Sequence, residues 1–309
     1  MRIAVLGPGG VGGLLAGALH RARSEVIVVA RDTTAAVVSE HGLQVHSVLL
    51  GSFVTRPRTV EQLEEPVDAL LVSTKASGLR PALERIAVEP GVVLPLLNGL
   101  DHIAVLRERF ALDTVLAGSI RVEADRPEPG MVVHTSPFLL VSMASAAQEA
   151  APAMEALASA LSEAGVPAKI TWPISARSEA DVMWSKLIRL NALACTTSAY
   201  DTLLGEIRST PRLRADLLGA IEEACAVARA EGATDVDAAT ALEELESAHD
   251  TLGSSMQRDI TAGRAPELDA IPGSVLRAGA RHGVACPTIE RLVIMIAERA
   301  GIEPPLVRA

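Results

Sequence analysis

The first half of the chain alternates short apolar runs with longer stretches of helical periodicity. Continuous apolar runs of this length are typical of parallel strands that are covered on both faces. Helical periodicity follows at Val11–Ala22 and at Leu79–Ile86. The apolar runs are Ile3–Leu6, Val26–Ala30, Ala69–Ser73, Val92–Leu96 and Val115–Gly118. The alternation predicts an α/β fold with a doubly wound parallel sheet.

Two later apolar runs are separated by a short turn-forming segment and not by a helical stretch. Val132–His134 and Phe138–Ser142 flank the turn-forming residues Thr135–Pro137. This pattern predicts a β-hairpin that extends the sheet with antiparallel strands.

After about Trp172 the pattern is helical only. We therefore predict an α/β domain over residues 1–172 and an all-helical domain over residues 173–309. The boundary is expected near Thr171–Ile174, where Pro173 interrupts the pattern. Apolar residues recur at helical spacing in Val182–Ala199, Leu213–Glu231, Ala238–Ala248, Ser274–His282 and Thr288–Ala300.

Length, charge and cysteine content limit the kinds of partner that this protein is expected to bind. A length of 309 residues fits about two domains. The chain has 28 basic and 38 acidic residues and a net charge of -10, so nucleic acid and anionic membranes would be repelled. No apolar run reaches the length of a membrane span, and the N-terminal residues lack a signal peptide's apolar stretch. The three cysteines have no C-x-x-C spacing, which fits a reducing cytoplasm.

The strongest local motif is Gly7-Pro8-Gly9-Gly10-Val11-Gly12, a match to G-x-G-x-x-G. It follows a predicted strand and opens a predicted helix, which is the context of a dinucleotide-binding turn. In such a turn Gly7 permits the tight bend, Gly9 lets a pyrophosphate approach the backbone, and Gly12 lets the helix pack closely. The N–H groups at the helix N-terminus would hold the anion. The alternative is a glycine-rich turn without a ligand.

The end of the next predicted strand distinguishes the two dinucleotides. Arg31 stands where an NAD-binding chain usually has a carboxylate, and it suits the 2′-phosphate of NADP. Asp32 comes one residue later and would favour NAD if its side chain turned inward. The pair favours NADP and leaves NAD as the alternative.

Two loops are expected at the carboxyl edge of the sheet, where ligands bind in this fold. Lys75 follows one strand and could reach the cofactor or an anionic substrate. Asn98 follows another strand and offers both a donor and an acceptor. The alternatives are a solvated surface lysine and a simple Asn98-Gly99 turn.

Further motifs in the second half complete a resemblance to a known family. They are Trp184-Ser185-Lys186-Leu187, Ser254-Ser255-Met256 with Asp259, Glu267 with Asp269, and Gly283–Pro287. With the earlier motifs, in this order, the chain resembles ketopantoate reductase (2-dehydropantoate 2-reductase), within the 6-phosphogluconate-dehydrogenase-like group. The resemblance implies an NADP-binding Rossmann domain over 1–172 and a helical substrate and catalytic domain over 173–309. It also implies that the active site lies in the cleft between the domains.

The resemblance implies reduction of a 2-keto acid by NADPH, by default 2-dehydropantoate to pantoate in pantothenate biosynthesis. The lysine matched by Lys186 is the general acid, and the residue matched by Glu267 hydrogen-bonds in the substrate site and helps to set the lysine's charge. The residue matched by Ser255 contacts the substrate carboxylate, and the one matched by Asn98 touches substrate and lysine. The implied cofactor-binding residues are Gly7, Pro8, Gly9, Gly10, Val11, Gly12, Arg31, Lys75, Asn98 and Glu267.

The chain departs from the family on the helix of Lys186. Ketopantoate reductases carry asparagines four and eight residues after the catalytic lysine, whereas this chain has Leu190 and Ala194. Asn191 lies five residues on, about 140° around a helix from Lys186, so it should not face the same side. We expect a more apolar wall beside the lysine than a ketopantoate site has.

Three functional hypotheses remain open. The first is the family reaction, and the second is the same reaction on a more apolar keto acid. The third is a non-catalytic NADP sensor, which only the missing asparagines favour. The seven histidines show no metal-ligand spacing. The sequence also lacks the G-x-S-x-G elbow that a Ser-His-Asp hydrolase would need. The C-terminal helices are apolar enough to pair with a second copy as a homodimer.

Overall fold

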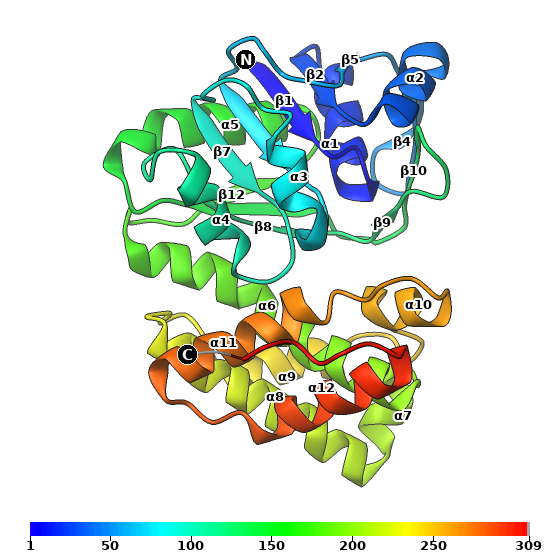
Figure 1. The fold of residues 1–309 in the computed structure, drawn as a ribbon, viewed down its shortest axis with the longest axis vertical. Helices are drawn as coiled ribbons and strands as arrows, with labels where there is room; N and C mark the ends of the chain where they lie inside the picture. The colour runs from blue at the N-terminus through cyan, green and yellow to red at the C-terminus, as the bar shows by residue number, and fades with distance from the viewer. Residues whose placement is uncertain (308–309) are drawn as a thin grey trace. The chain divides into compact units, whose positions relative to one another are not determined.

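The computed structural model describes residues 1–307, and its contacts divide the chain into two compact units (Figure 1). The first unit comprises Met1–Leu97 and His102–Val182, and the second comprises Asn98–Asp101 and the chain from Met183 onward. This division falls later than the boundary expected near Thr171–Ile174.

The later division has a physical reason at the start of helix α6 (Ala176–Tyr200). Arg107 donates to both carboxylate oxygens of Glu179, at 2.7 and 2.8 Å. The Ala146 N–H donates to the same carboxylate at 2.9 Å. These bonds hold the first turns of α6 in the first unit, and the rest of the helix belongs to the second.

The first unit contains a five-stranded sheet in the order β5-β2-β1-β6-β7, in which every pairing is parallel. From β1 the chain first extends the sheet to one side and then returns to build the other side. This confirms the doubly wound α/β fold, whose ligands bind where the strand order reverses. The strands are β1 (Arg2–Leu6), β2 (Glu25–Val29), β5 (Arg58–Val60), β6 (Ala69–Val72) and β7 (Val92–Pro95).

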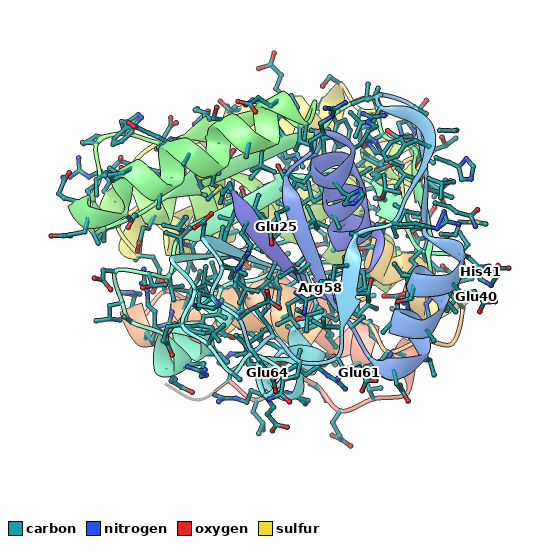
Figure 2. All side chains as sticks on the ribbon, turned by 90° about the horizontal axis from the view of Figure 1, so that it is seen from above. Glu25, Glu40, His41, Arg58, Glu61 and Glu64 are labelled. Carbon is teal, nitrogen blue, oxygen red and sulfur yellow. The ribbon has the colours of Figure 1, made fainter. Side chains whose placement is uncertain are left out.

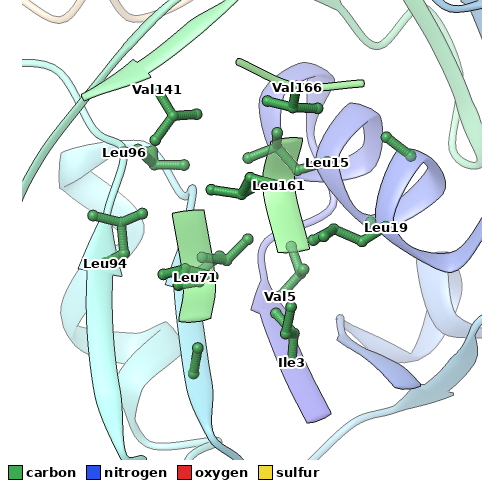
Figure 3. Close-up of a cluster of buried hydrophobic side chains, with 14 of the residues drawn as sticks. Ile3, Val5, Leu15, Leu19, Leu71, Leu94, Leu96, Val141, Leu161 and Val166 are labelled. Atoms are coloured by element: carbon green, nitrogen blue, oxygen red, sulfur yellow. The ribbon is translucent and has the colours of Figure 1, made fainter. Parts of the chain in front are cut away.

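The sheet is buried on both faces. Ile3 and Val5 belong to a cluster that includes residues of α1 (Gly10–Arg21) and α5 (Ala151–Glu163). Figure 3 shows this cluster, with Val5, Leu15 and Leu161 among its members. The alternate residues Ala4 and Leu6 belong to a second cluster with residues of α3 (Leu79–Leu83) and α4 (His102–Arg109). Burial on both faces explains why β1, β2, β6 and β7 contain continuous apolar runs.

The predicted hairpin of Val132–His134 and Phe138–Ser142 is wrong. Strand β10 (Met131–His134) pairs with β3 (Leu43–Ser47) and β9 (Ala124–Asp125). Strand β11 (Leu140–Ala144) pairs instead with β8 (Ala117–Arg121) and β12 (Ala168–Ile170). Consecutive strands do pair antiparallel elsewhere, β3 with β4 (Gly51–Thr55) and β9 with β10.

Side-chain bonds explain why the two strands separate. Ser136 Oγ accepts the Glu123 N–H at 2.9 Å and donates to the Phe138 carbonyl at 2.7 Å. The buried His134 ring lies 2.8 Å from Ser47 Oγ and 3.1 Å from Ser136 Oγ. The connecting residues are therefore anchored to distant segments and do not form a tight turn.

Helices are the regular secondary structure of the second unit in the residues described, as predicted. Helix α8 is its centre and packs against α7, α9, α11 and α12. In residues 1–307 no helix is both long and apolar enough to cross a membrane. After α6 the helices are α7 (Leu204–Ser209), α8 (Pro211–Ala230), α9 (Ala238–Glu246), α10 (Ser255–Thr261), the π-helix η3 (Asp269–Gly273), α11 (Ser274–His282) and α12 (Pro287–Ala300).

All three cysteines lie buried in the second unit as free thiols. Burial raises the pKa of the Cys286 thiol to about 12, with a smaller contribution from the Glu223 carboxylate. Burial also raises the pKa of Cys195 and of Cys225. Because the thiolate is the reactive form, these thiols should be inert in the folded protein.

We therefore expect stability to fall at alkaline pH. An unfolded thiol releases its proton near pH 9, whereas a folded thiol with a raised pKa keeps it. The stabilisation is thus complete below about pH 9 and is lost as pH rises toward 12, by roughly 1 kcal/mol per pH unit for each such thiol. Urea unfolding from pH 8 to 10 measures the slope, which Cys286→Ala should reduce. A disulfide reagent that modifies the folded protein as fast as the unfolded chain would contradict the expectation.

Candidate functional site

The turn from β1 into α1 has the geometry that its glycines suggest. Gly7 has a φ of 89°, in the left-handed region that glycine tolerates best. A Cβ on Gly12 would overlap the Ser73 hydroxyl and the Gly7 carbonyl, and one on Gly10 would overlap the Ala124 carbonyl. Close packing against these neighbours therefore requires glycine at both positions.

Gly9 differs from its neighbours, and the difference bears on the cofactor. A Cβ on Gly9 would meet no heavy atom within 4 Å. Gly9 is the N-cap of α1, which has no side-chain cap and no acidic residue in its first turn. Next to Gly7 of the same turn, the buried Thr74 Oγ1 lacks a hydrogen-bond partner within residues 1–307. An open approach to an uncapped helix N-terminus fits an anionic pyrophosphate.

Pro8 and Val11, the other two residues of the motif, are buried and half-buried within this turn. The turn also packs directly on the loop after β6, because Ser73 Oγ donates to the Gly7 carbonyl at 2.8 Å. The glycine motif and this loop therefore form one continuous surface at the carboxyl edge of β1 and β6.

The charged residues expected near the cofactor lie at the same edge of the sheet. Arg31 is exposed directly after β2, as the N-cap of α2 (Asp32–His41). Asp32 Oδ1 accepts the Thr33 N–H at 2.8 Å, so this carboxylate is engaged by its own helix. Lys75 is exposed after β6, as the N-cap of the 3₁₀-helix η1 (Ala76–Gly78).

The charged residues in Figure 2 include the first residues of two strands of this sheet, Glu25 of β2 and Arg58 of β5. They begin their strands, so they lie at the amino edge of the parallel sheet. The carboxyl edge, where Arg31 follows β2, is the opposite one.

In the second unit the structure brings three of the predicted residues together. Lys186 Nζ donates to Asn98 Oδ1 at 2.9 Å. Asn98 Nδ2 donates to Glu267 Oε2 at 3.0 Å. We call Lys186, Asn98 and Glu267 the polar triad. All three side chains are partly exposed, so solvent or a ligand can reach them.

Backbone geometry places Asn98 beside Glu267, although 169 residues separate them in sequence. Gly99 has a φ of 85°, and a Cβ there would overlap the Ala270 carbonyl of η3. In that π-helix the Gly273 N–H donates to the Leu268 carbonyl at 3.0 Å. The Asn98-Gly99 turn therefore rests on the π-helix that follows Glu267, and such π-turns are frequent at functional sites.

Helix α6 presents Lys186 by burying the residue two positions earlier. Trp184 is only 1% exposed. Two residues are about 200° apart around a helix, so Lys186 lies on the opposite side from this anchor. Leu190, one turn after Lys186, is also partly exposed.

Asn191 does not share the face of Lys186. It is fully buried, and its Oδ1 accepts a hydrogen bond from the Cys195 thiol at 3.5 Å. Ala194 is also buried. The helix therefore offers Leu190, and no asparagine, one turn from the lysine.

The two serines of the Ser254-Ser255 pair have different environments. Ser254 is buried as the N-cap of α10, where its Oγ accepts the Gln257 N–H at 3.0 Å. The Thr197 hydroxyl donates to the same oxygen at 2.8 Å. Ser255 is exposed, so it remains the serine of the pair that a ligand can reach.

One residue near the polar triad escaped the sequence analysis. Arg277 of α11 binds Asp101, just after the Asn98-Gly99 turn, and Asp269, just after Glu267. No local motif marks an arginine on the fourth residue of a helix. Within residues 1–307 no group of three or more His, Cys, Asp or Glu side chains could hold a metal ion.

Known proteins are similar in sequence to this chain over nearly its whole length. The family model of ketopantoate reductase PanE/ApbA matches residues 3–143, and the model of its C-terminal domain matches residues 180–300. A 2-dehydropantoate 2-reductase of Mycobacterium tuberculosis is 30% identical over 305 residues, 96% of each chain. YkpB of Bacillus subtilis, an uncharacterized oxidoreductase, is 30% identical over 94% of this chain and 96% of its own.

Solved structures share the fold. The 2-dehydropantoate 2-reductase of Geobacter metallireducens superposes with a TM-score of 0.86, at 25% identity, over 96% of this chain and 99% of its own. D-mandelate dehydrogenase with NADH and anilino(oxo)acetate superposes with a TM-score of 0.84, at 23% identity, over 97% and 99%. The chain therefore belongs to the ketopantoate reductase (PanE/ApbA) family of oxidoreductases, which reduce a keto acid to a hydroxy acid.

Proposed function

We propose that this protein reduces a 2-keto acid to the 2-hydroxy acid with NADPH, and that Lys186 is the general acid. The polar triad is the observation that carries the proposal. It holds an ammonium group through an amide, and a carboxylate fixes the orientation of that amide. Such an arrangement suits proton donation to an oxygen that becomes negative during the reaction.

Each member of the triad has a defined task. Asn98 accepts from the ammonium with Oδ1 and donates to Glu267 with Nδ2, so its amide has only one orientation that satisfies both neighbours. Glu267 fixes that orientation by accepting from the amide nitrogen. Lys186 then donates a proton to the substrate carbonyl oxygen and regains one from solvent. This donation is strongest in the transition state, where the oxygen carries the most charge.

The first unit would hold the cofactor, which supplies a hydride to the keto carbon when bound. The glycine turn would receive the pyrophosphate at Gly9, where the structure leaves an open approach. Arg31 would pair with the 2′-phosphate, since it is exposed at the end of β2 and Asp32 bonds to its own helix. Lys75 would lie near the cofactor and the substrate.

Two substrate classes are in question. 2-Dehydropantoate is the default, because relatives such as the Mycobacterium tuberculosis protein carry that activity in their names. A more apolar 2-keto acid is the second candidate, because Leu190 lies one turn from Lys186, where a substrate hydroxyl finds no polar partner. An unpaired buried hydroxyl costs about 1–3 kcal/mol.

A panel of 2-keto acids tests both the reaction and the substrate. NADPH oxidation is followed with 2-dehydropantoate, 2-oxoisovalerate and phenylglyoxylate, in wild type and in Leu190→Asn. We expect the variant to raise kcat/KM for 2-dehydropantoate relative to 2-oxoisovalerate by roughly tenfold, as a hydroxyl partner returns. The control is Leu112→Asn, the same substitution at an exposed position, because a nearby residue such as Leu193 is buried.

One outcome would contradict the proposed reaction, and another would exclude the second substrate class. NADPH binding without turnover of any keto acid would indicate a sensor. A strong preference of wild type for 2-dehydropantoate, unchanged in Leu190→Asn, would exclude the apolar substrate class and assign the hydroxyl contact to another residue.

A further inference from the structure

We propose that Arg277 is a positioning residue, which fixes the geometry of the polar triad by holding together the two chain segments that carry Asn98 and Glu267. This inference rests on the proposed function, because it takes the polar triad to be catalytic. Arg277 itself touches none of the three triad side chains in the bonds described below.

The guanidinium binds one carboxylate from each segment. Nε and Nη2 donate to Asp101 Oδ2, at 3.1 and 2.6 Å. Nη1 donates to Asp269 Oδ1 at 2.7 Å, and Nη2 also donates to the Asp269 backbone carbonyl at 2.8 Å. We call Asp101, Arg277 and Asp269 the arginine clamp.

The clamp acts close to the triad in sequence as well as in space. Asp101 follows Asn98 by three residues, and Asp269 follows Glu267 by two. The bond to the Asp269 carbonyl fixes backbone at the start of η3, the helix on which Gly99 rests. A shift of either segment would therefore change the distance between Asn98 Nδ2 and Glu267 Oε2, which is 3.0 Å.

The guanidinium at the centre of the clamp is more buried than the two carboxylates it binds. The Arg277 side chain is 19% exposed, whereas Asp101 is 42% and Asp269 is 74% exposed. Burial alone would lower the pKa of Arg277, but its hydrogen bonds to the Asp101 and Asp269 carboxylates outweigh that effect and raise the pKa. The planar fork of a guanidinium can bind both segments in fixed directions, which the single ammonium of lysine cannot do.

Kinetics of Arg277→Ala give the first test. We expect kcat to fall by roughly tenfold with KM for the keto acid nearly unchanged, since a small misplacement of catalytic groups slows the chemical step. In an Asn98→Ala background the same substitution should have little further effect, because the residue it positions is already gone. Equal losses in both backgrounds would overturn the proposal.

Matched variants separate positioning from general stability. Arg214→Ala removes another ion pair of the helical unit, with Glu246 at 2.7 Å, and should leave kcat unchanged. Arg277→Lys keeps the positive charge but lacks the planar fork, so its kcat should lie between those of Arg277→Ala and wild type. If Arg277→Ala does not fold, Asp101→Asn weakens the same clamp with little change of shape and should lower kcat in the same direction.

A spectroscopic test needs no turnover. The chain has only Lys75, Lys169 and Lys186, so protein labelled with ¹⁵N-lysine gives three side-chain ammonium signals, which single Lys→Arg variants assign. Arg277→Ala should shift or broaden the Lys186 signal and leave the Lys75 and Lys169 signals in place. An unchanged Lys186 signal would overturn the clamp. A shifted signal in a protein that reduces no keto acid would support the clamp and refute the proposed function.

Discussion

Replacement of Lys186 by methionine is expected to lower kcat for keto-acid reduction by about 10²- to 10⁴-fold, the usual contribution of a general acid. Methionine keeps much of the unbranched apolar stem of lysine but has no proton to donate. The oxygen of the substrate would then develop its charge without the ammonium that Asn98 and Glu267 hold in place. The measurement is the steady-state rate of NADPH oxidation at saturating keto acid.

Lys169→Met is the matched control for this prediction. Lys169 is exposed on β12 in the first unit, and its loss should leave kcat unchanged. NADPH binding, measured by the change in its fluorescence, should persist in both variants. A Lys186→Met protein that keeps kcat within threefold of wild type would exclude Lys186 as the general acid.

The second large effect is expected at Arg31. Its change to alanine should lower kcat/KM for NADPH by about 10- to 150-fold and leave kcat/KM for NADH nearly unchanged. The reason is the loss of charge-assisted hydrogen bonds to the 2′-phosphate of NADPH, which contribute about 1.5–3 kcal/mol. NADH has an uncharged hydroxyl at that position, so it loses no such bonds. The measurement compares wild type and variant with each cofactor at a fixed keto-acid concentration.

Arg56→Ala removes another exposed arginine of the first unit and should affect neither cofactor. Asp32→Asn should also leave the cofactor preference nearly unchanged, because Asp32 Oδ1 bonds to the Thr33 N–H. Equal losses with NADPH and NADH in Arg31→Ala would contradict the assignment. A wild-type preference for NADH would contradict it as well.

Local features of the sequence were sufficient for most of the fold. The apolar runs that become β1, β2, β6 and β7 are continuous because both faces of the sheet are covered, so the pattern itself records the architecture. Gly7 could be identified as a turn residue because φ is a local constraint, and Gly12 as a packing residue because it also approaches the Gly7 carbonyl within the same motif. Helical periodicity likewise predicted the second unit.

The pairing of β10 and β11 could not be predicted in the same way. Proximity in sequence favoured a hairpin, but β10 pairs with β3 and β11 with β8, from distant parts of the chain. Strand pairing depends on which partner is within reach in the folded state, and contacts such as His134 with Ser47 supply that information only there.

The same distinction between local and distant contacts applies to the candidate site. The sequence indicated which side chains could carry the chemistry, since Lys186, Asn98 and Glu267 stand in motifs whose order along the chain resembles that of a known family. Only the tertiary structure decided that they form one hydrogen-bonded chain, that Asn191 lies on another face of α6, and that Arg277 ties the segments together. The physical reason is range: backbone conformation and helical faces depend on neighbours along the chain, whereas hydrogen bonds across 169 residues depend on how the whole unit packs.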